Sequence, residues 1–137
     1  MYKLDDRLEN DTFHVTDLAL CDVLLMNDTQ FPWLILVPRV EGITEIIDLS
    51  QTQQLQLWEE SALISRVLRN AFVPDKLNVA ALGNVVSQLH VHHVVRMKTD
   101  CAWPAPIWGR QPTVAYTQEA AQSLITQIQK QIQKELS

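Results

Sequence analysis

The sequence predicts an α+β domain with a mainly antiparallel sheet of about five strands and two principal helices. Short β-branched apolar runs, two long segments with helical periodicity and short connections between neighbouring elements predict this class. The chain has 137 residues, of which 47% are hydrophobic and 20% are charged. These values are typical of a single globular domain, so we expect one domain over residues 1–137.

The N-terminal half contains the first two predicted strands. Residues 18–26 (LALCDVLLM) form one apolar run and residues 33–40 (WLILVPRV) form the next. Residues 27–32 (NDTQFP) between them predict a turn, so we expect a hairpin. A further short apolar segment covers residues 43–49.

Two helices are expected, each with a capping residue. Ser50 and Gln53 fit a capping box, and the helix that follows should end before Pro74. Residues 76–82 predict a strand, Gly83 begins a turn, and residues 89–97 predict the last strand. A proline-rich aromatic loop follows at residues 103–109, and Thr117 caps a final helix. The apolar stripe of this last helix consists of Ala121, Leu124, Ile125, Ile128 and Ile132.

Charge and composition exclude several classes of function. The net charge is −5 and no basic run is present, which argues against binding to duplex nucleic acid or to an anionic membrane. A mononucleotide needs only a few local donors and is not excluded. No apolar run approaches the length of a membrane span and no signal peptide is recognised, so we expect a cytoplasmic protein. Cys21 and Cys101 belong to no Cys-x-x-Cys pair and are expected to be buried free thiols.

The most informative segment is residues 88–96 (QLHVHHVVR), which holds three of the four histidines. Successive side chains of a strand alternate between faces, so Gln88, His90 and His92 share one face and His93 points to the other. An isolated buried histidine is most often a core residue, but this polar row on an apolar strand needs partners. It fits either a nucleophile with polar neighbours or part of a metal site.

A metal site is the weaker of these two readings. His90 and His92 offer two imidazole ligands, whereas a catalytic zinc generally takes three protein ligands. His93 faces the opposite side and His14 is distant in sequence. We therefore expect neither a metal nor another cofactor, and a zinc enzyme remains the least favoured alternative.

Residues 78–96, together with the hairpin at residues 25–39, resemble the histidine triad (HIT) superfamily of nucleotide hydrolases and transferases. Its signature is His-φ-His-φ-His-φ-φ, where φ is apolar, often followed by an arginine. Matching Arg96 places the three triad positions at Gln88, His90 and His92. Residues 103–109 resemble the tail of a bacterial HIT branch. The resemblance implies a HIT-like fold, a small-molecule nucleotide substrate and a symmetric homodimer.

The resemblance also implies roles for these residues. His90 would attack the α-phosphorus and form a nucleotidyl-histidine that water then opens, and His92 would orient His90. Asn84 and nearby backbone amides would stabilise the developing charge. Gln88 departs from the pattern, because an amide can donate a hydrogen bond to the leaving group but cannot deliver a proton.

Three further polar residues match binding positions of the family. Asn27 and Asp28 stand where family members grip the ribose, although a polar pair also suits a hairpin turn. Asn78 matches a position near the phosphate, and its plainer interpretation is an amide at the sheet edge. Trp33 would wall the base pocket or simply belong to the core.

The sequence thus supports two functions from different classes. The first is a HIT-type hydrolase of nucleotide phosphoramidates or dinucleotides, or a nucleotidyl transferase, acting through a covalent nucleotidyl-histidine. The second is a nucleotide-binding regulatory protein with little or no turnover.

Overall fold

The computed structural model describes residues 1–137 and contains a five-stranded sheet in which every neighbouring pair is antiparallel. The order across the sheet is β1-β2-β3-β5-β4. The strands are β1 (Thr12–Asp17), β2 (Cys21–Met26), β3 (Trp33–Pro38), β4 (Lys76–Ala80) and β5 (Val91–Arg96). The helices are α1 (Asp6–Asp11), α2 (Gln51–Phe72) and α3 (Gln118–Leu136), with a short 3-10 helix, η1, at Ile46–Asp48. The predicted α+β class is confirmed.

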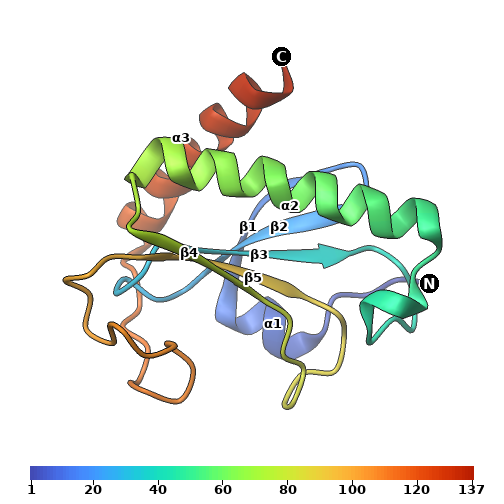
Figure 1. Ribbon diagram of the computed structural model, residues 1–137, viewed down its shortest axis with the longest axis horizontal. Helices are drawn as coiled ribbons and strands as arrows, with labels where there is room; N and C mark the ends of the chain where they lie inside the picture. The colour runs from blue at the N-terminus through green and yellow to red at the C-terminus, as the bar shows by residue number, and fades with distance from the viewer.

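The sheet has a different cover on each face. Figure 1 shows α2 and α3 above the sheet and α1 with the loop after β5 below it. The larger core, a cluster of 19 buried residues, includes side chains of α2 and α3 and the sheet residues that face them. A smaller cluster of nine buried residues lies on the opposite face and includes Trp33, Ile35 and Ala102. Neither long helix carries an apolar stretch of the kind that could span a lipid bilayer.

The two predicted helix starts are confirmed by their capping contacts. The Ser50 hydroxyl accepts from the Gln53 amide at 3.2 Å, and the Gln53 side chain accepts from the Ser50 amide at 2.9 Å. α2 ends at Phe72, just before Pro74 as expected. The Thr117 hydroxyl accepts from the amide of Ala120 at 3.1 Å and caps α3.

Two N-terminal elements were not predicted. α1 has six residues with a single buried side chain, Leu8, and β1 is a mostly polar edge strand with one buried residue, Val15. Both lack the apolar periodicity on which the sequence interpretation depends. The apolar segment at residues 43–49 contains the short 3-10 helix η1. The expectation of two buried thiols is wrong for Cys101, which is exposed, whereas Cys21 is buried and both are free.

Candidate active site

β5 presents histidines to both faces of the sheet. In its pairing with β3, His92 lies opposite Ile35 and His93 lies opposite Leu34, so the two imidazoles point to opposite faces. The ring centroid of His90, just before β5, lies 4.9 Å from that of His92. These two imidazoles therefore share a face, as the alternation predicts. Both residues are 7% exposed, whereas His93 is fully buried.

The tautomer of His90 is set by a backbone contact. Its Nδ1 atom lies 2.7 Å from the carbonyl oxygen of Gln88. A carbonyl can only accept, so Nδ1 carries a proton, and in the neutral imidazole Nε2 keeps its lone pair. The backbone carbonyl that orients His90 therefore belongs to Gln88, whereas the resemblance assigned the orienting role to His92. Gln88 lies at a bend before β5, where its carbonyl is free to accept this bond.

His92 has the opposite polarity. The indole N–H of Trp33 donates to Nδ1 of His92 at 2.9 Å, so Nε2 is the ring nitrogen that carries the proton. Burial first, and then the neighbouring His90 and His93, lower the pKa of His92 to about 3. The ring of Trp108 packs edge-on against His92 with centroids 5.3 Å apart. His92 is therefore held neutral with a hydrogen-bond donor at Nε2.

His93 belongs to the opposite side of the sheet. Its Nδ1 lies 3.1 Å from the carbonyl of Val91, and its Nε2 lies 2.7 Å from the hydroxyl of Ser61 on α2. Burial lowers the pKa of His93 to about 4, so the imidazole is neutral near pH 7. His93 thus links β5 to α2 and takes no part in the candidate site.

The side chain of Gln88 is engaged by the N-terminal segment. Its Oε1 accepts from the amide of Asp5 at 2.8 Å, and its Nε2 donates to the carbonyl of Lys3 at 2.8 Å. Neither contact could be read from the sequence, because the partners are backbone groups more than eighty positions away. The first triad position therefore holds an amide that already has a donor and an acceptor partner.

Asn27 and Asp28 bind the segment that leads into α3. The Asn27 side chain accepts from the amide of Tyr116 at 2.8 Å. Oδ1 of Asp28 accepts from the Gln30 amide at 3.0 Å and from the Val114 amide at 3.3 Å. Both residues therefore have a structural role. Asp28 is only 3% exposed, and a carboxylate that is so buried needs hydrogen-bond donors such as these two backbone amides.

Asp28 also lines an aromatic pocket of about 160 Å³ next to His92. Phe31, Trp33 and Trp108 form its aromatic walls. The indole Nε1 of Trp108 is buried and has no hydrogen-bond partner in the chain. The pocket thus offers flat apolar surfaces and a buried carboxylate beside the histidine face.

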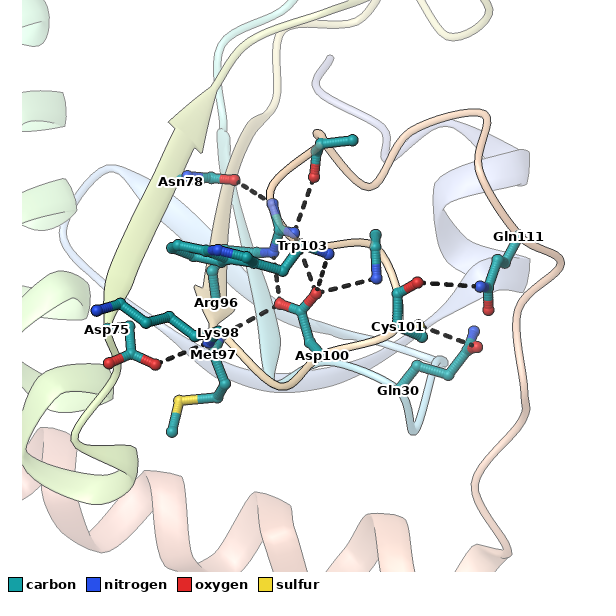
Figure 2. Close-up of polar contacts among 12 residues, drawn as sticks. Gln30, Asp75, Asn78, Arg96, Met97, Lys98, Asp100, Cys101, Trp103 and Gln111 are labelled. Carbon is teal, nitrogen blue, oxygen red and sulfur yellow. Dashed lines mark hydrogen bonds and ion pairs between the residues drawn. The ribbon is translucent and has the colours of Figure 1, made fainter.

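Asn78 lies in a network around Arg96, at the end of β5 distant from His90. Figure 2 shows the Arg96 guanidinium between Asp100, Asn78 and the backbone of the following loop. Arg96 Nε lies 2.8 Å from Asp100, Nη1 lies 2.8 Å from Asn78 Oδ1, and Nη2 lies 2.8 Å from the carbonyl of Ala105. The Arg96 side chain beside Asp100 holds the pKa of that carboxyl at about 2. Asn78 therefore supports the loop after β5.

The structure brings together some of the expected residues and separates others. Gln88 and His92 both contact His90. The aromatic pocket that Asp28 lines adjoins His92. Asn84 is exposed in the turn after Gly83, and it is not among the residues that line a recess of about 30 Å³ beside His90. The sequence interpretation missed the N-terminal contacts to Gln88 and the loop network of Arg96. The only sequence signal for this network is the spacing of Asp100, four residues after Arg96.

The histidine face has no third metal ligand. The one group of three side chains with suitable spacing is His14, Asp17 and Asp22, none of which lies on β5. His14 is 2.7 Å from Asp17, and Arg39 is 3.3 Å from Asp22. The guanidinium supplies positive charge to that cluster, and the zinc alternative gains no support at His90 and His92.

Residues 7–99 match the family model described as the HIT domain. The match spans more than half of the chain, and the chain belongs to the HIT family.

Solved structures agree with this assignment. A histidine triad protein from Marinobacter aquaeolei VT8 is 50% identical, with 98% of each chain covered and a TM-score of 0.95. One from Bradyrhizobium japonicum is 44% identical over 96% of this chain and 98% of its own, with a TM-score of 0.93. The diadenosine triphosphate hydrolase of Plasmodium falciparum shares the fold at 15% identity, with 100% of this chain and 84% of that chain covered and a TM-score of 0.64. No match was found among curated proteins.

Proposed function

We propose that the protein is a nucleotide hydrolase or nucleotidyl transferase that acts through a covalent nucleotidyl-His90. The observation that carries the proposal is the hydrogen bond between His90 Nδ1 and the carbonyl of Gln88, which leaves Nε2 with a free lone pair. Phosphoramidates and dinucleotides of the kind cleaved by HIT enzymes are the expected substrates.

In the proposed reaction, Nε2 of His90 attacks the α-phosphorus and a nitrogen–phosphorus bond forms. The bond from phosphorus to the leaving group breaks, and its electron pair departs with that group. Water, or another acceptor in a transferase, then displaces the histidine from phosphorus. The N–H at Nε2 of His92, together with backbone amides, would stabilise negative charge on the phosphoryl oxygens. The same role for Asn84, which is exposed in the turn after Gly83, stays a prediction from the resemblance.

The aromatic pocket beside His92 is the proposed nucleoside site. Trp33 and Trp108 supply faces on which a base can stack, and a ribose hydroxyl can donate to Asp28. A pocket of about 160 Å³ fits part of a nucleotide rather than the whole of it. The phosphate would therefore project out of the pocket toward His90. A phosphate contact by Asn78 stays a prediction from the resemblance, because its side chain binds Arg96 at the opposite end of β5.

Trapping the covalent intermediate tests the proposal. The wild type is mixed with an activated nucleotide and quenched in parallel in base and in acid, because a phosphoramidate is acid-labile. Mass spectrometry of the basic quench should locate a nucleotidyl group on His90. Turnover that persists undiminished in His90→Ala contradicts covalent catalysis at this residue.

One observation favours the second candidate function, a nucleotide-binding regulatory protein with little turnover. The amide of Gln88, at the position where most family members place a proton donor, is bound on both sides by backbone groups. Calorimetric titration with a nucleoside monophosphate, run beside turnover assays, separates the two. Micromolar binding with no product and no adduct indicates the regulatory protein.

We also propose a homodimer. Leu55 and Trp58 are 62% and 52% exposed on α2, and Val79 is 42% exposed on the edge strand β4. Apolar side chains beside an unpaired strand edge are a usual feature of subunit interfaces. The cytoplasmic location stays a prediction from the sequence.

A further inference from the structure

The N-terminal segment lies against the first triad position. The amide of Asp5 and the carbonyl of Lys3 bind the two ends of the Gln88 side chain, each at 2.8 Å. Figure 1 shows this segment running from the N-terminus beneath the sheet to α1. We call residues 2–5 the N-terminal strap.

Other contacts hold the strap in place on both sides of Gln88. The hydroxyl of Tyr2 donates to Asp22 on β2 at 2.9 Å. Tyr2 and Leu4 pack against the smaller core cluster, on the sheet face that carries His92. The Asp5 carboxylate accepts from the amide of Arg7 at 2.8 Å and so caps α1. The strap is thus fixed at its ends, with Gln88 between them.

Gln88 joins the strap to His90 through two different groups. Its backbone carbonyl binds Nδ1 of His90, and its side-chain amide binds the strap. The recess lined by His90, Gln88 and Ser87 has a volume of about 30 Å³, enough for no more than about two water molecules. In the proposed reaction, a group that leaves phosphorus beside residue 88 would depart past the strap residues that bind Gln88.

We propose that Gln88 is a positioning residue that seats the N-terminal strap against the leaving-group side of the site, and that this limits the protein to nucleotides with small leaving groups. This inference rests on the proposed function for its consequence on substrates, but the seating of the strap stands without it. The amide donates hydrogen bonds without transferring a proton, so the leaving group departs with the bonding electron pair and takes any proton from water.

Glutamine suits this position because the end of its side chain offers one acceptor and one donor group side by side. Glutamate at position 88 would keep the acceptor for the Asp5 amide and lose the donor for the Lys3 carbonyl. Alanine would lose both. A series of Gln88→Glu and Gln88→Ala therefore removes the contacts stepwise.

Hydrogen exchange at the amide of Asp5 tests the seating directly. Exchange should be on the order of tenfold faster in Gln88→Ala, from the loss of two hydrogen bonds, and intermediate in Gln88→Glu. Gln127→Ala, at an exposed glutamine of α3, is the matched control and should leave this amide unchanged. Equal protection of the Asp5 amide in wild type and Gln88→Ala overturns the proposal.

Substrate selectivity tests the consequence. Two nucleoside 5′-phosphoramidates are compared, one with methylamine and one with a bulky amine of similar basicity as leaving group. The ratio of kcat/KM for the bulky over the small substrate should rise several-fold in Gln88→Ala, even if both values fall. An unchanged ratio together with faster exchange overturns the limit on leaving-group size.

If the wild type turns over neither substrate, the proposed function fails and the exchange experiment still decides the seating. Competition binding of the two intact phosphoramidates then replaces kinetics as the measure of selectivity. Gln88→Ala should bind the bulky compound better relative to the small one than the wild type does. Equal relative affinities in the two proteins overturn the size limit.

Discussion

His90 and His92 are equally buried on one face of the sheet, yet their hydrogen bonds leave a lone pair free at Nε2 of one ring and an N–H free at Nε2 of the other. His90 donates from Nδ1 and presents a lone pair at Nε2, whereas His92 accepts at Nδ1 from Trp33 and presents an N–H at Nε2. A lone pair can attack phosphorus, and an N–H can stabilise charge on its oxygens. The two imidazoles are therefore not interchangeable.

Kinetics should separate the two roles. His90→Ala should lower kcat/KM by at least about a thousandfold while nucleotide affinity changes little, because a nucleophile acts mainly in the transition state. His92→Ala should have a smaller effect, since it removes one stabilising donor. Steady-state assays and calorimetric titration measure the two quantities. A larger loss in His92→Ala than in His90→Ala would reverse the assignment.

Stability should depend on pH through the two buried histidines of β5. Burial lowers the pKa of His92 to about 3 and that of His93 to about 4, from an ordinary value of 6.5. Below pH 6.5 the unfolded chain binds protons at both residues, while the folded chain leaves them neutral down to about pH 4. The unfolding free energy should therefore fall with decreasing pH in this window, by roughly 1 kcal/mol per pH unit for each histidine.

Urea unfolding between about pH 7 and pH 4.5 measures this slope, within the range where the unfolded histidines titrate. His93→Gln should flatten this slope by the contribution of one proton. Gln127→Ala, at an exposed glutamine that does not titrate, should leave the slope unchanged. The same slope in His93→Gln and wild type would show that His93 is not the titrating group.

The loop after β5 is an element built around one ion pair. The side chains of Arg96 and Asp100 are 2% and 6% exposed, and Asp100 also accepts from the amides of Met97, Ala102 and Trp103 (Figure 2). The loop carries Trp108, which contacts His92. The network therefore positions one wall of the proposed nucleoside pocket.

Breaking this pair should destabilise the loop. Asp100→Ala leaves the Arg96 guanidinium buried without its carboxylate and should lower the unfolding free energy by roughly 3 kcal/mol. Asp75→Ala, which removes an exposed carboxylate bound to the amide of Lys98, should cost less than about 1 kcal/mol. Denaturant unfolding measures both variants. Equal losses would mean that the Arg96 pair contributes no more than a surface contact.

The elements differ in how far the sequence predicts them. The capped helices and the apolar strands carry periodic patterns, so β3, β5 and α2 lie within a few residues of the predicted ranges. β1 forms by pairing with the edge of β2, and α1 packs against the sheet face that carries the smaller core cluster. Such tertiary contacts leave no periodic pattern in the local sequence. Strand alternation predicted that His90 and His92 share a face, whereas the triad positions were assigned from the resemblance to the family. The contacts of Gln88 with the strap depend on tertiary structure and could not be predicted from the sequence.

At the scale of the whole molecule, the sheet ends at β4 with one edge unpaired. Two exposed apolar side chains follow β4 closely in the sequence. Leu82 is 48% exposed and Val85 is 74% exposed. Leu55 and Trp58 of α2 add further exposed apolar surface. Because a two-fold axis repeats one surface on both subunits, a second copy of the chain can cover these side chains with the same residues.

Multi-angle light scattering of the purified protein should therefore report a dimer at micromolar concentration. Trp58→Glu should shift the protein to a monomer, since burying an unpaired carboxylate in an apolar interface is costly. Val114→Glu introduces the same charge at a residue that is 51% exposed in the segment before α3, and it should leave the dimer intact. A monomeric wild type contradicts the homodimer, and a dimeric Trp58→Glu variant shows that the interface lies elsewhere on the molecule.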